Sequence, residues 1–289
     1  MQTPTRTAGL TLIELLITLG IVGMILNVVF LLLNQGIGSS NNLVARAGMV
    51  QDAQVVQRLL AGRLNEAIYV YGYNAAGSAA SNSFAFGSGV TVNAVGYRGT
   101  GGSAWALQTD PILAMILPPK TPGGECVQDA NTTVNPDGSD GCFRFFAYYP
   151  LKRNTLTSAT LSPSNKPDMD PANDNRWVLM EYRRNLYCSG VNWRPSYNTD
   201  GSFNASLLPP RSGCIEAAGV SARLLADFVR PSDNPTTGGF DVVVNTAQKD
   251  VSFTLAFERA SGSSTLELPS SSGATLQSYI TTVRPKNWF

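Results

Sequence analysis

The sequence contains no histidine among its 289 residues. Histidine is the commonest metal ligand, and its side chain is the one that ordinarily titrates near neutral pH. Its absence excludes a Ser-His-Asp triad and any zinc site built on imidazole. The sequence also has no Gly-rich phosphate loop and no Gly-x-Ser-x-Gly nucleophile motif. We therefore predict that the chain is not an enzyme and holds no cofactor.

Charged residues are also few, at 14% of the chain, and the net charge at pH 7 is +1. A balance so close to zero gives no reason to expect strong general binding to nucleic acid or to an anionic membrane. Tyr182, Arg183, Tyr187, Trp193 and Arg194 do suggest stacking and phosphate contacts with single-stranded DNA. Because alternate residues of a strand bury aromatic side chains in any case, direct nucleic-acid binding is not expected.

Four cysteines are present, Cys126, Cys142, Cys188 and Cys214, and none belongs to a C-x-x-C pair. This spacing gives no support to a zinc ribbon or a thioredoxin-like redox site. If the C-terminal part of the chain is exported, an even number of cysteines indicates two disulfides, and four cysteines allow three pairings. We favour Cys126–Cys142 and Cys188–Cys214, because each pair closes a loop rich in Gly, Asn, Pro and Asp. Four unpaired buried thiols are the alternative.

The longest apolar run extends from Leu10 to Leu33 and contains one charged residue, Glu14. At about 1.5 Å per residue, a helix of this length spans the ~30 Å hydrocarbon core of a membrane. A carboxylate inside such a helix is costly and usually has a partner. Cleavage after Gly9 would create an amine at Leu10, about one helical turn from the Glu14 carboxylate. The two groups would then neutralise each other within one chain or between neighbouring chains.

The segment Gly9-Leu10-Thr11-Leu12-Ile13-Glu14-Leu15-Leu16, preceded by the polar leader Met1–Gly9, resembles the class III signal of type IV pilins and of type II secretion pseudopilins. The one departure is Leu10, where most members have phenylalanine. The resemblance implies that a prepilin peptidase cuts between Gly9 and Leu10 and methylates the new amine of Leu10. It also implies that Glu14 meets a terminal amine when the helix packs in the core of a filament.

Two other interpretations of this segment are open. A secretory signal peptide has a shorter apolar region, of about 7–15 residues, although Gly38-Ser39-Ser40 is small enough for a cleavage site. An uncut signal anchor fits the length of the helix, but it explains neither Glu14 nor the junction after Gly9.

After the membrane-length segment, the polar and glycine-containing stretch Asn34–Gly38 forms a place where a helix can bend or melt. From residue 41 to about residue 70, apolar residues recur every three or four positions, which predicts an amphipathic helix. The stripe consists of Met49, Ala53, Val56, Leu60, Leu64 and Ile68. We expect this stripe to pack on a β-sheet.

Beyond Tyr71 the periodicity changes to two and turn residues become abundant, which predicts short antiparallel strands. The expected strands are Ile112–Leu117, Phe143–Tyr149, Trp177–Arg183, Leu224–Arg230, Phe240–Val244, Val251–Glu258 and Leu276–Val283. The two that flank Asn245–Asp250 should form a hairpin.

The predicted fold class is therefore α+β, with a long N-terminal helix packed on an antiparallel β-rich body, as in pilins. The expected parts are a leader (1–9), a transmembrane and filament-core helix (10–34), an amphipathic helix (35–70) and a β-rich body (71–289). The C-terminal part is similar to larger minor pilins of the PilW type and to J-type pseudopilins. The similar segments are Leu225–Val229, the strand 251–258, and Tyr279–Arg284 followed by Asn287, with Pro285 and Lys286 as an interruption.

Two acidic stretches are weak candidates for calcium, which takes about six to eight oxygen ligands from flexible loops. They are Asp129, Asp137 and Asp140, between the first two cysteines, and then Asp168, Asp170, Asn173 and Asp174. Neither stretch matches an EF-hand, and Asp-Gly and Asn-Pro sequences are common in turns. We therefore expect solvated turns at both places.

From these patterns we expect a minor subunit of a type IV pilus, in the filament or in its priming or tip complex, that serves motility, adhesion or DNA uptake. It would lie in the bacterial inner membrane with the N-terminus in the cytoplasm, on the side of Arg6, and then in an extracellular or periplasmic filament. The implied partners are prepilin peptidase, the inner-membrane assembly platform, and other major and minor pilins. The alternatives are a type II secretion pseudopilin and an uncut, membrane-anchored ligand-binding module.

Overall fold

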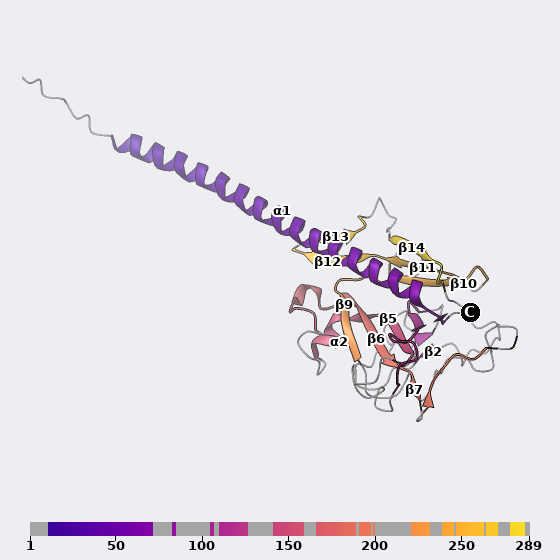
Figure 1. Ribbon diagram of the computed structural model, residues 1–289. Helices are drawn as coiled ribbons and strands as arrows, with labels where there is room; N and C mark the ends of the chain where they lie inside the picture. The colour runs from indigo at the N-terminus through magenta and orange to yellow at the C-terminus, as the bar shows by residue number, and fades with distance from the viewer. Residues whose placement is uncertain are drawn as a thin grey trace, which may run out of the picture. The chain divides into compact units, whose positions relative to one another are not determined.

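The computed structural model describes residues 11–71, 83–84, 105–106, 110–126, 141–158, 166–188, 191–197, 199, 221–231, 239–245, 247–262, 264–270 and 278–286. The chain divides into two compact units, residues 1–48 and residues 49–289. The described elements are one long helix, two short helices and antiparallel strands (Figure 1), so the predicted α+β class is confirmed.

The long helix, α1 (Leu12–Glu66), exposes every apolar side chain from Leu12 to Leu33. Among the described residues it is the one helix long and apolar enough to cross a membrane. This length and composition are compatible with a membrane anchor or with a signal sequence.

α1 is continuous through Asn34–Gly38, the stretch where a bend or a melted turn was expected. Each of the two glycines there weakens the helix by about 1 kcal/mol relative to alanine, but neither breaks it. The sequence has no proline between Pro4 and Pro111, and proline is the residue that would interrupt the helix. α1 ends at Glu66 rather than near residue 70, because the next residues form strand β1 (Tyr69–Val70).

A five-stranded antiparallel sheet forms the centre of the second unit, in the order β1-β4-β5-β6-β9. Its other strands are β4 (Leu113–Leu117), β5 (Arg144–Lys152), β6 (Trp177–Asn185) and β9 (Ser221–Ala226). All five residues of β4 are buried, and β5 and β6 are buried along most of their length. The sheet therefore has a hydrophobic core on each face, which explains why these strands are apolar in long runs rather than in alternation.

A three-stranded sheet follows in the order β10-β11-β14, with β10 (Asp241–Asn245), β11 (Asp250–Leu255) and β14 (Tyr279–Val283). The hairpin predicted around Asn245–Asp250 is confirmed, because Val244 pairs with Val251 and Asn245 with Asp250. β11 alternates between buried and half-buried residues, as a strand with one face on the core should.

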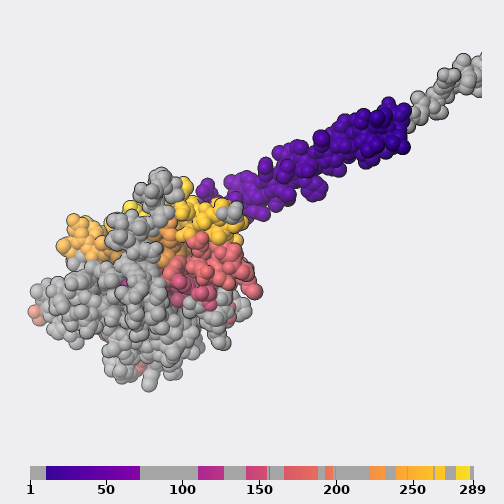
Figure 2. Space-filling model, turned by 180° about the vertical axis from the view of Figure 1, so that it is seen from behind, coloured from indigo at the N-terminus to yellow at the C-terminus, as the bar shows by residue number. Residues whose placement is uncertain are grey.

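The predicted helical stripe is buried in the core that the two sheets share. This core contains Met49, Ala53, Val56, Leu60 and Leu64 of α1, Leu113, Met115, Phe146, Tyr148 and Leu179 of the larger sheet, and Val242, Val244, Val251, Phe253 and Val283 of the smaller sheet. Ile68 is also buried, but it belongs to the core on the opposite face of the five-stranded sheet. In Figure 2 the C-terminal segments, among them the smaller sheet (orange to yellow), adjoin described residues between 141 and 188 (pink) on the surface of this unit.

Two predicted strands end earlier in the structure than in the sequence-based expectation. The strand expected over Leu224–Arg230 ends at Ala226, because Phe228 has a left-handed backbone conformation with φ of 60°. The strand expected over Val251–Glu258 is interrupted at Ala256. Its second half, β12 (Phe257–Ser261), leaves the three-stranded sheet and pairs with β13 (Ser264–Leu268).

The remaining described elements are short. They are α2 (Arg153–Ser158), the 3-10 turn η4 (Pro171–Asn173), the pair β2 (Ser83–Phe84) and β3 (Trp105–Ala106), and the pair β7 (Tyr187–Cys188) and β8 (Val191–Asn192).

Candidate functional site

The Glu14 carboxylate caps the N-terminal end of α1. Its Oε2 accepts hydrogen bonds from the backbone N–H and the side-chain hydroxyl of Thr11, both at 2.9 Å. Thr11 lies just before the helix and Glu14 is its third residue, which is the spacing of a capping box. This local pairing satisfies one of the N–H groups that a helix start leaves open. Gly9 and Leu10, the residues of the expected cleavage site, lie outside the described residues.

One oxygen of this carboxylate has no partner among the described residues. Among the described residues, Oε1 of Glu14 accepts no hydrogen bond, while Oε2 accepts two. Glu14 is also the only charged residue between Arg6 and Arg46 in the sequence. In a hydrocarbon environment a carboxylate needs a cationic or hydrogen-bonding partner. The end of α1 therefore offers an acceptor to an amine, in addition to its bonds with Thr11.

The disulfide predicted between Cys126 and Cys142 is present, with the two Cα atoms 4.8 Å apart. Gly141, next to it, donates its N–H to the Glu125 carbonyl at 3.0 Å. A Cβ atom at Gly141 would lie 1.9 Å from the Gly124 carbonyl oxygen. Only glycine therefore fits where these two chain segments approach each other closely. The second expected pair lies outside the described residues, because they do not include Cys214.

The first calcium candidates, Asp129, Asp137 and Asp140, also lie outside the described residues. The residues of the second acidic stretch bind protein groups instead. Asp170 Oδ2 accepts from the Asn173 amide at 2.8 Å and from Arg259 at 3.3 Å. Among the described residues, no three His, Cys, Asp or Glu side chains gather at one place in a way that would hold a metal ion.

The acidic stretch surrounds Arg153, whose guanidinium is fully buried. Arg153 donates to both carboxylate oxygens of Asp227, at 2.8 and 2.9 Å, and to the backbone oxygen of Asp168 at 2.8 Å. This two-pronged contact matches the planar fork of arginine. Burial lowers the pKa of Arg153, but the hydrogen bonds and charge of Asp227 outweigh burial and raise it, so the side chain remains charged.

Phe228 lies between two guanidinium groups at the point where the larger sheet meets β12. Its ring centroid is 5.0 Å from Cζ of Arg153 and 4.7 Å from Cζ of Arg259. Its N–H donates to Asp227 Oδ1, and its carbonyl accepts from the N–H of Glu258. A bulky residue at positive φ costs about 1–3 kcal/mol, which these contacts offset. We call Arg153, Asp170, Asp227, Phe228 and Arg259 the arginine joint.

A second buried charge lies beside the stripe of α1. Glu181 of β6 is fully buried, and it accepts hydrogen bonds from the Tyr148 hydroxyl at 3.0 Å and pairs with Arg223 Nε at 2.7 Å. Glu181 and Arg223 are direct partners across β6 and β9. Neither this pair nor the arginine joint could be predicted from the sequence, because the residues that meet in each are far apart in the chain and match no motif.

Among the aromatic and basic residues that suggested DNA, Tyr182 lies in the second core and Trp193 packs against it, whereas Arg183 and Tyr187 are half-buried and Arg194 is exposed. Tyr182 is buried and packs edge-to-face on Phe145, and Arg184 is buried as well. Trp193 packs edge-to-face on Phe143, with the ring centroids 5.3 Å apart. Tyr182 and Phe145 belong to the second core, and Phe143 and Trp193 pack against it.

Comparison with known proteins gave no match to this chain among family models, curated proteins or solved structures.

We predict that Arg153→Leu lowers the free energy of unfolding by about 3 kcal/mol, because it leaves the Asp227 carboxylate and the Asp168 carbonyl without their buried donor. Arg153→Lys should also destabilise the protein, by a smaller amount, because an ammonium cannot contact both oxygens of Asp227 in parallel. Arg58→Leu, at an exposed position of α1, is the control and should change stability by no more than about 0.5 kcal/mol. Urea unfolding followed by far-UV circular dichroism measures all three. A loss at Arg153 no larger than at Arg58 would contradict the role assigned to the joint.

We also predict that Asp52→Asn stabilises the protein at neutral pH. Burial, followed by the negative charge of Asp227, raises the pKa of Asp52 above its ordinary value of 3.8. The folded state then binds this proton more tightly than the unfolded state, so stability falls as the pH rises from the unfolded pKa through the folded one. The gain should be a few tenths of a kcal/mol at pH 7, since the group is partly solvated, and should vanish near pH 3. Equal gains at both pH values, measured by thermal unfolding, would refute this explanation.

Proposed function

We propose that this protein is a minor subunit of a type IV pilus, held in the bacterial inner membrane by the first part of α1 until it enters the filament or its priming or tip complex. The single observation that carries the proposal is the N-terminal arrangement. A membrane-length apolar segment bears one carboxylate, Glu14, at the third position of α1, and Gly9 lies five residues before that carboxylate.

The geometry at the helix start supports this function. Glu14 is held toward the N-terminus by Thr11, on the side where cleavage after Gly9 would place the new amine of Leu10. Its second oxygen is available to that amine or to the amine of a neighbouring subunit. In a filament core without water, such a pair leaves no charge without a partner.

The body supports a role outside the membrane. A disulfide between Cys126 and Cys142 is typical of chains exported to an oxidising compartment. The β-rich body of the second unit is large beside the helix. We therefore favour a priming or tip position, where a bulky body is most easily accommodated.

The first test is the N-terminal sequence and intact mass of the protein isolated from its own cells. We expect a chain that begins at N-methyl-Leu10, lighter by two protons for each disulfide. A chain that begins at Met1 would instead indicate an uncut membrane-anchored domain. A type II secretion pseudopilin would have the same processed terminus, so the subunits that co-purify with the protein distinguish secretion from pilus assembly.

We predict that Gly9→Leu blocks processing and leaves the full-length precursor in the membrane, because the resemblance places the cleaved bond directly after Gly9. Immunoblotting of membranes reports the precursor by its larger mass. Ala8→Leu, one position earlier, is the matched control and should be processed. Full processing of Gly9→Leu would remove the basis of the proposal.

We predict that Glu14→Gln and Glu14→Ala both insert in the membrane but enter filaments poorly. Glutamine retains the ability to cap Thr11, since Glu and Gln both serve in a capping box, but it has no charge for an amine. The glutamine variant thus separates a charge-pairing role from a purely structural cap. Glu66→Ala, at the exposed C-terminal end of the same helix, is the control.

Incorporation is measured by the amount of each variant in sheared, purified filaments relative to the amount in membranes. Normal incorporation of Glu14→Gln together with loss for Glu14→Ala would assign Glu14 to capping alone. Normal incorporation of both would exclude any role for Glu14 in assembly.

A further inference from the structure

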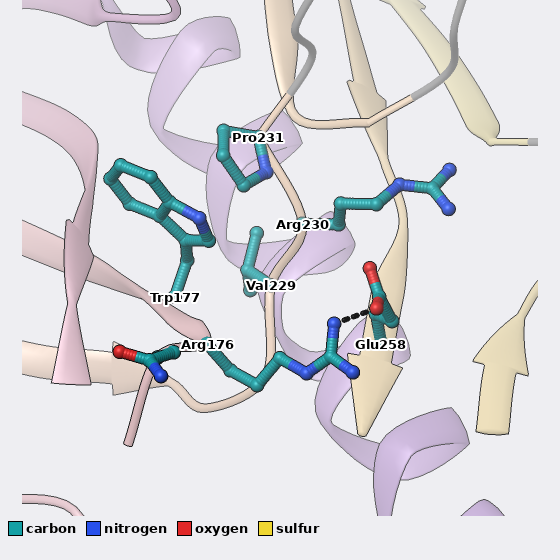
Figure 3. Close-up of a pocket in the computed structure, with 7 residues that line it drawn as sticks. Arg176, Trp177, Val229, Arg230, Pro231 and Glu258 are labelled. Carbon is teal, nitrogen blue, oxygen red and sulfur yellow. Dashed lines mark ion pairs between the residues drawn. The ribbon is translucent and has the colours of Figure 1, made fainter. Parts of the chain in front are cut away.

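A small pocket of about 120 Å³ lies in the second unit where three segments meet (Figure 3). Its lining comes from the start of β6, from the chain after β9, and from β12. The residues are Asn175, Arg176, Trp177, Val229, Arg230, Pro231 and Glu258. Sites for drug-sized ligands are typically about 300–1,000 Å³, so this pocket accommodates a single ring-sized group.

The walls of the pocket are fixed by backbone hydrogen bonds. Arg176 N–H donates to Asn173, Arg230 N–H donates to Ala256 at 2.8 Å, and the Arg230 carbonyl accepts from Phe240 at 2.6 Å. The arginine joint adjoins the same place, because the N–H of Glu258 donates to the Phe228 carbonyl at 2.7 Å. The pocket is therefore formed by the fold itself and needs no rearrangement of the backbone to bind a ligand.

The pocket has one apolar side and one polar side. Figure 3 shows the indole of Trp177 near Pro231, with Val229 between Trp177 and the ion pair of Arg176 with Glu258. Val229 and Pro231 are buried, whereas Trp177, Arg176 and Glu258 are each partly exposed, and Nζ of Lys152 lies 5.4 Å from the centroid of the Trp177 ring. The guanidinium of Arg230 points away from Trp177, so this residue contributes its aliphatic stem.

The ion pair restricts the chemistry of the ligand. An anion near Arg176 would be repelled by Glu258, and a cation near Glu258 would be repelled by Arg176. A purely apolar ring would remove water from both charges without replacing the lost hydrogen bonds. A neutral ring that carries adjacent hydroxyl groups can accept from the guanidinium, donate to the carboxylate and lay its C–H face on the indole.

We propose that this pocket binds a neutral pyranose unit of a carbohydrate. Trp177 stacks on one face of the ring, and the Arg176–Glu258 pair together with Asn175 bonds its hydroxyl groups. The binding is a property of the second unit alone, so it does not depend on filament assembly.

The test uses the full chain in a detergent without a sugar headgroup, such as an oxyethylene detergent, because a maltoside would compete. The probes are the methyl glycosides of glucose, galactose, mannose and N-acetylglucosamine at millimolar concentration. We expect saturation-transfer NMR signals on the ring protons of at least one of them. The same measurement with glucuronate and glucosamine should give weaker signals, because each carries a charge that one member of the ion pair repels.

Three variants locate the site. Trp177→Ala removes the stacking surface and Glu258→Gln removes the charged acceptor at nearly constant volume, and each should weaken binding by about tenfold or more. Tyr197→Ala removes an exposed aromatic residue outside the pocket, and binding should be unchanged. Thermal unfolding of each variant reports whether the fold is intact. If Trp177→Ala does not fold, Glu258→Gln decides the test.

The proposal is overturned if none of the neutral glycosides gives a signal, or if a folded Trp177→Ala or Glu258→Gln variant binds as well as the natural protein. Tighter binding of glucuronate than of the neutral sugars would also overturn it. A chain that begins at Met1 in cells, which would refute the pilus proposal, leaves this measurement unaffected.

Discussion

The burial of one helical stripe is the constraint on which the second unit depends. Met49, Ala53, Val56, Leu60 and Leu64 recur at helical spacing, and they meet inward-facing residues of both the five-stranded and the three-stranded sheet. Each of the larger side chains contributes about 1.5–3 kcal/mol when it is fully buried. Both sheets pack on this stripe and share the core that it forms. The larger sheet also has a second core on its other face, and its central strands are therefore apolar on both sides.

The arginine joint is the polar counterpart of that core. Two guanidinium groups and two carboxylates are partly buried around Phe228. Their burial is tolerated because Arg153 binds Asp227 and Arg259 binds Asp170. The same contacts hold the chain after β9 in a left-handed turn, which directs Val229–Pro231 toward β12. The joint thereby positions two of the three segments that line the pocket beside Trp177, because Val229 directly follows Phe228 and Glu258 directly precedes Arg259.

The start of α1 illustrates how one residue can carry two physical roles. Glu14 caps the helix through one carboxylate oxygen, a role that any soluble helix could use. What distinguishes this helix is its surroundings, because nearly all side chains from Leu12 to Leu33 are apolar and all of them are exposed. A charge in that environment is costly without a partner, and this cost links the local geometry to the proposed assembly.

Several features could be predicted from local periodicity alone. Spacing along the chain predicted the apolar helix, the buried stripe from Met49 to Leu64 and the hairpin around Asn245–Asp250. The Cys126–Cys142 disulfide was favoured among three possible pairings because of the composition of the loop that it closes, and spacing alone did not determine it. Three other features depend on contacts between distant parts of the folded chain. These are the end of α1, the division at Ala256 of the strand expected over Val251–Glu258, and the choice of charged residues that are buried. Arg153 and Asp227 are 74 positions apart, so no local pattern relates them. Burial of such a charge is favourable only beside the partner that the complete fold supplies.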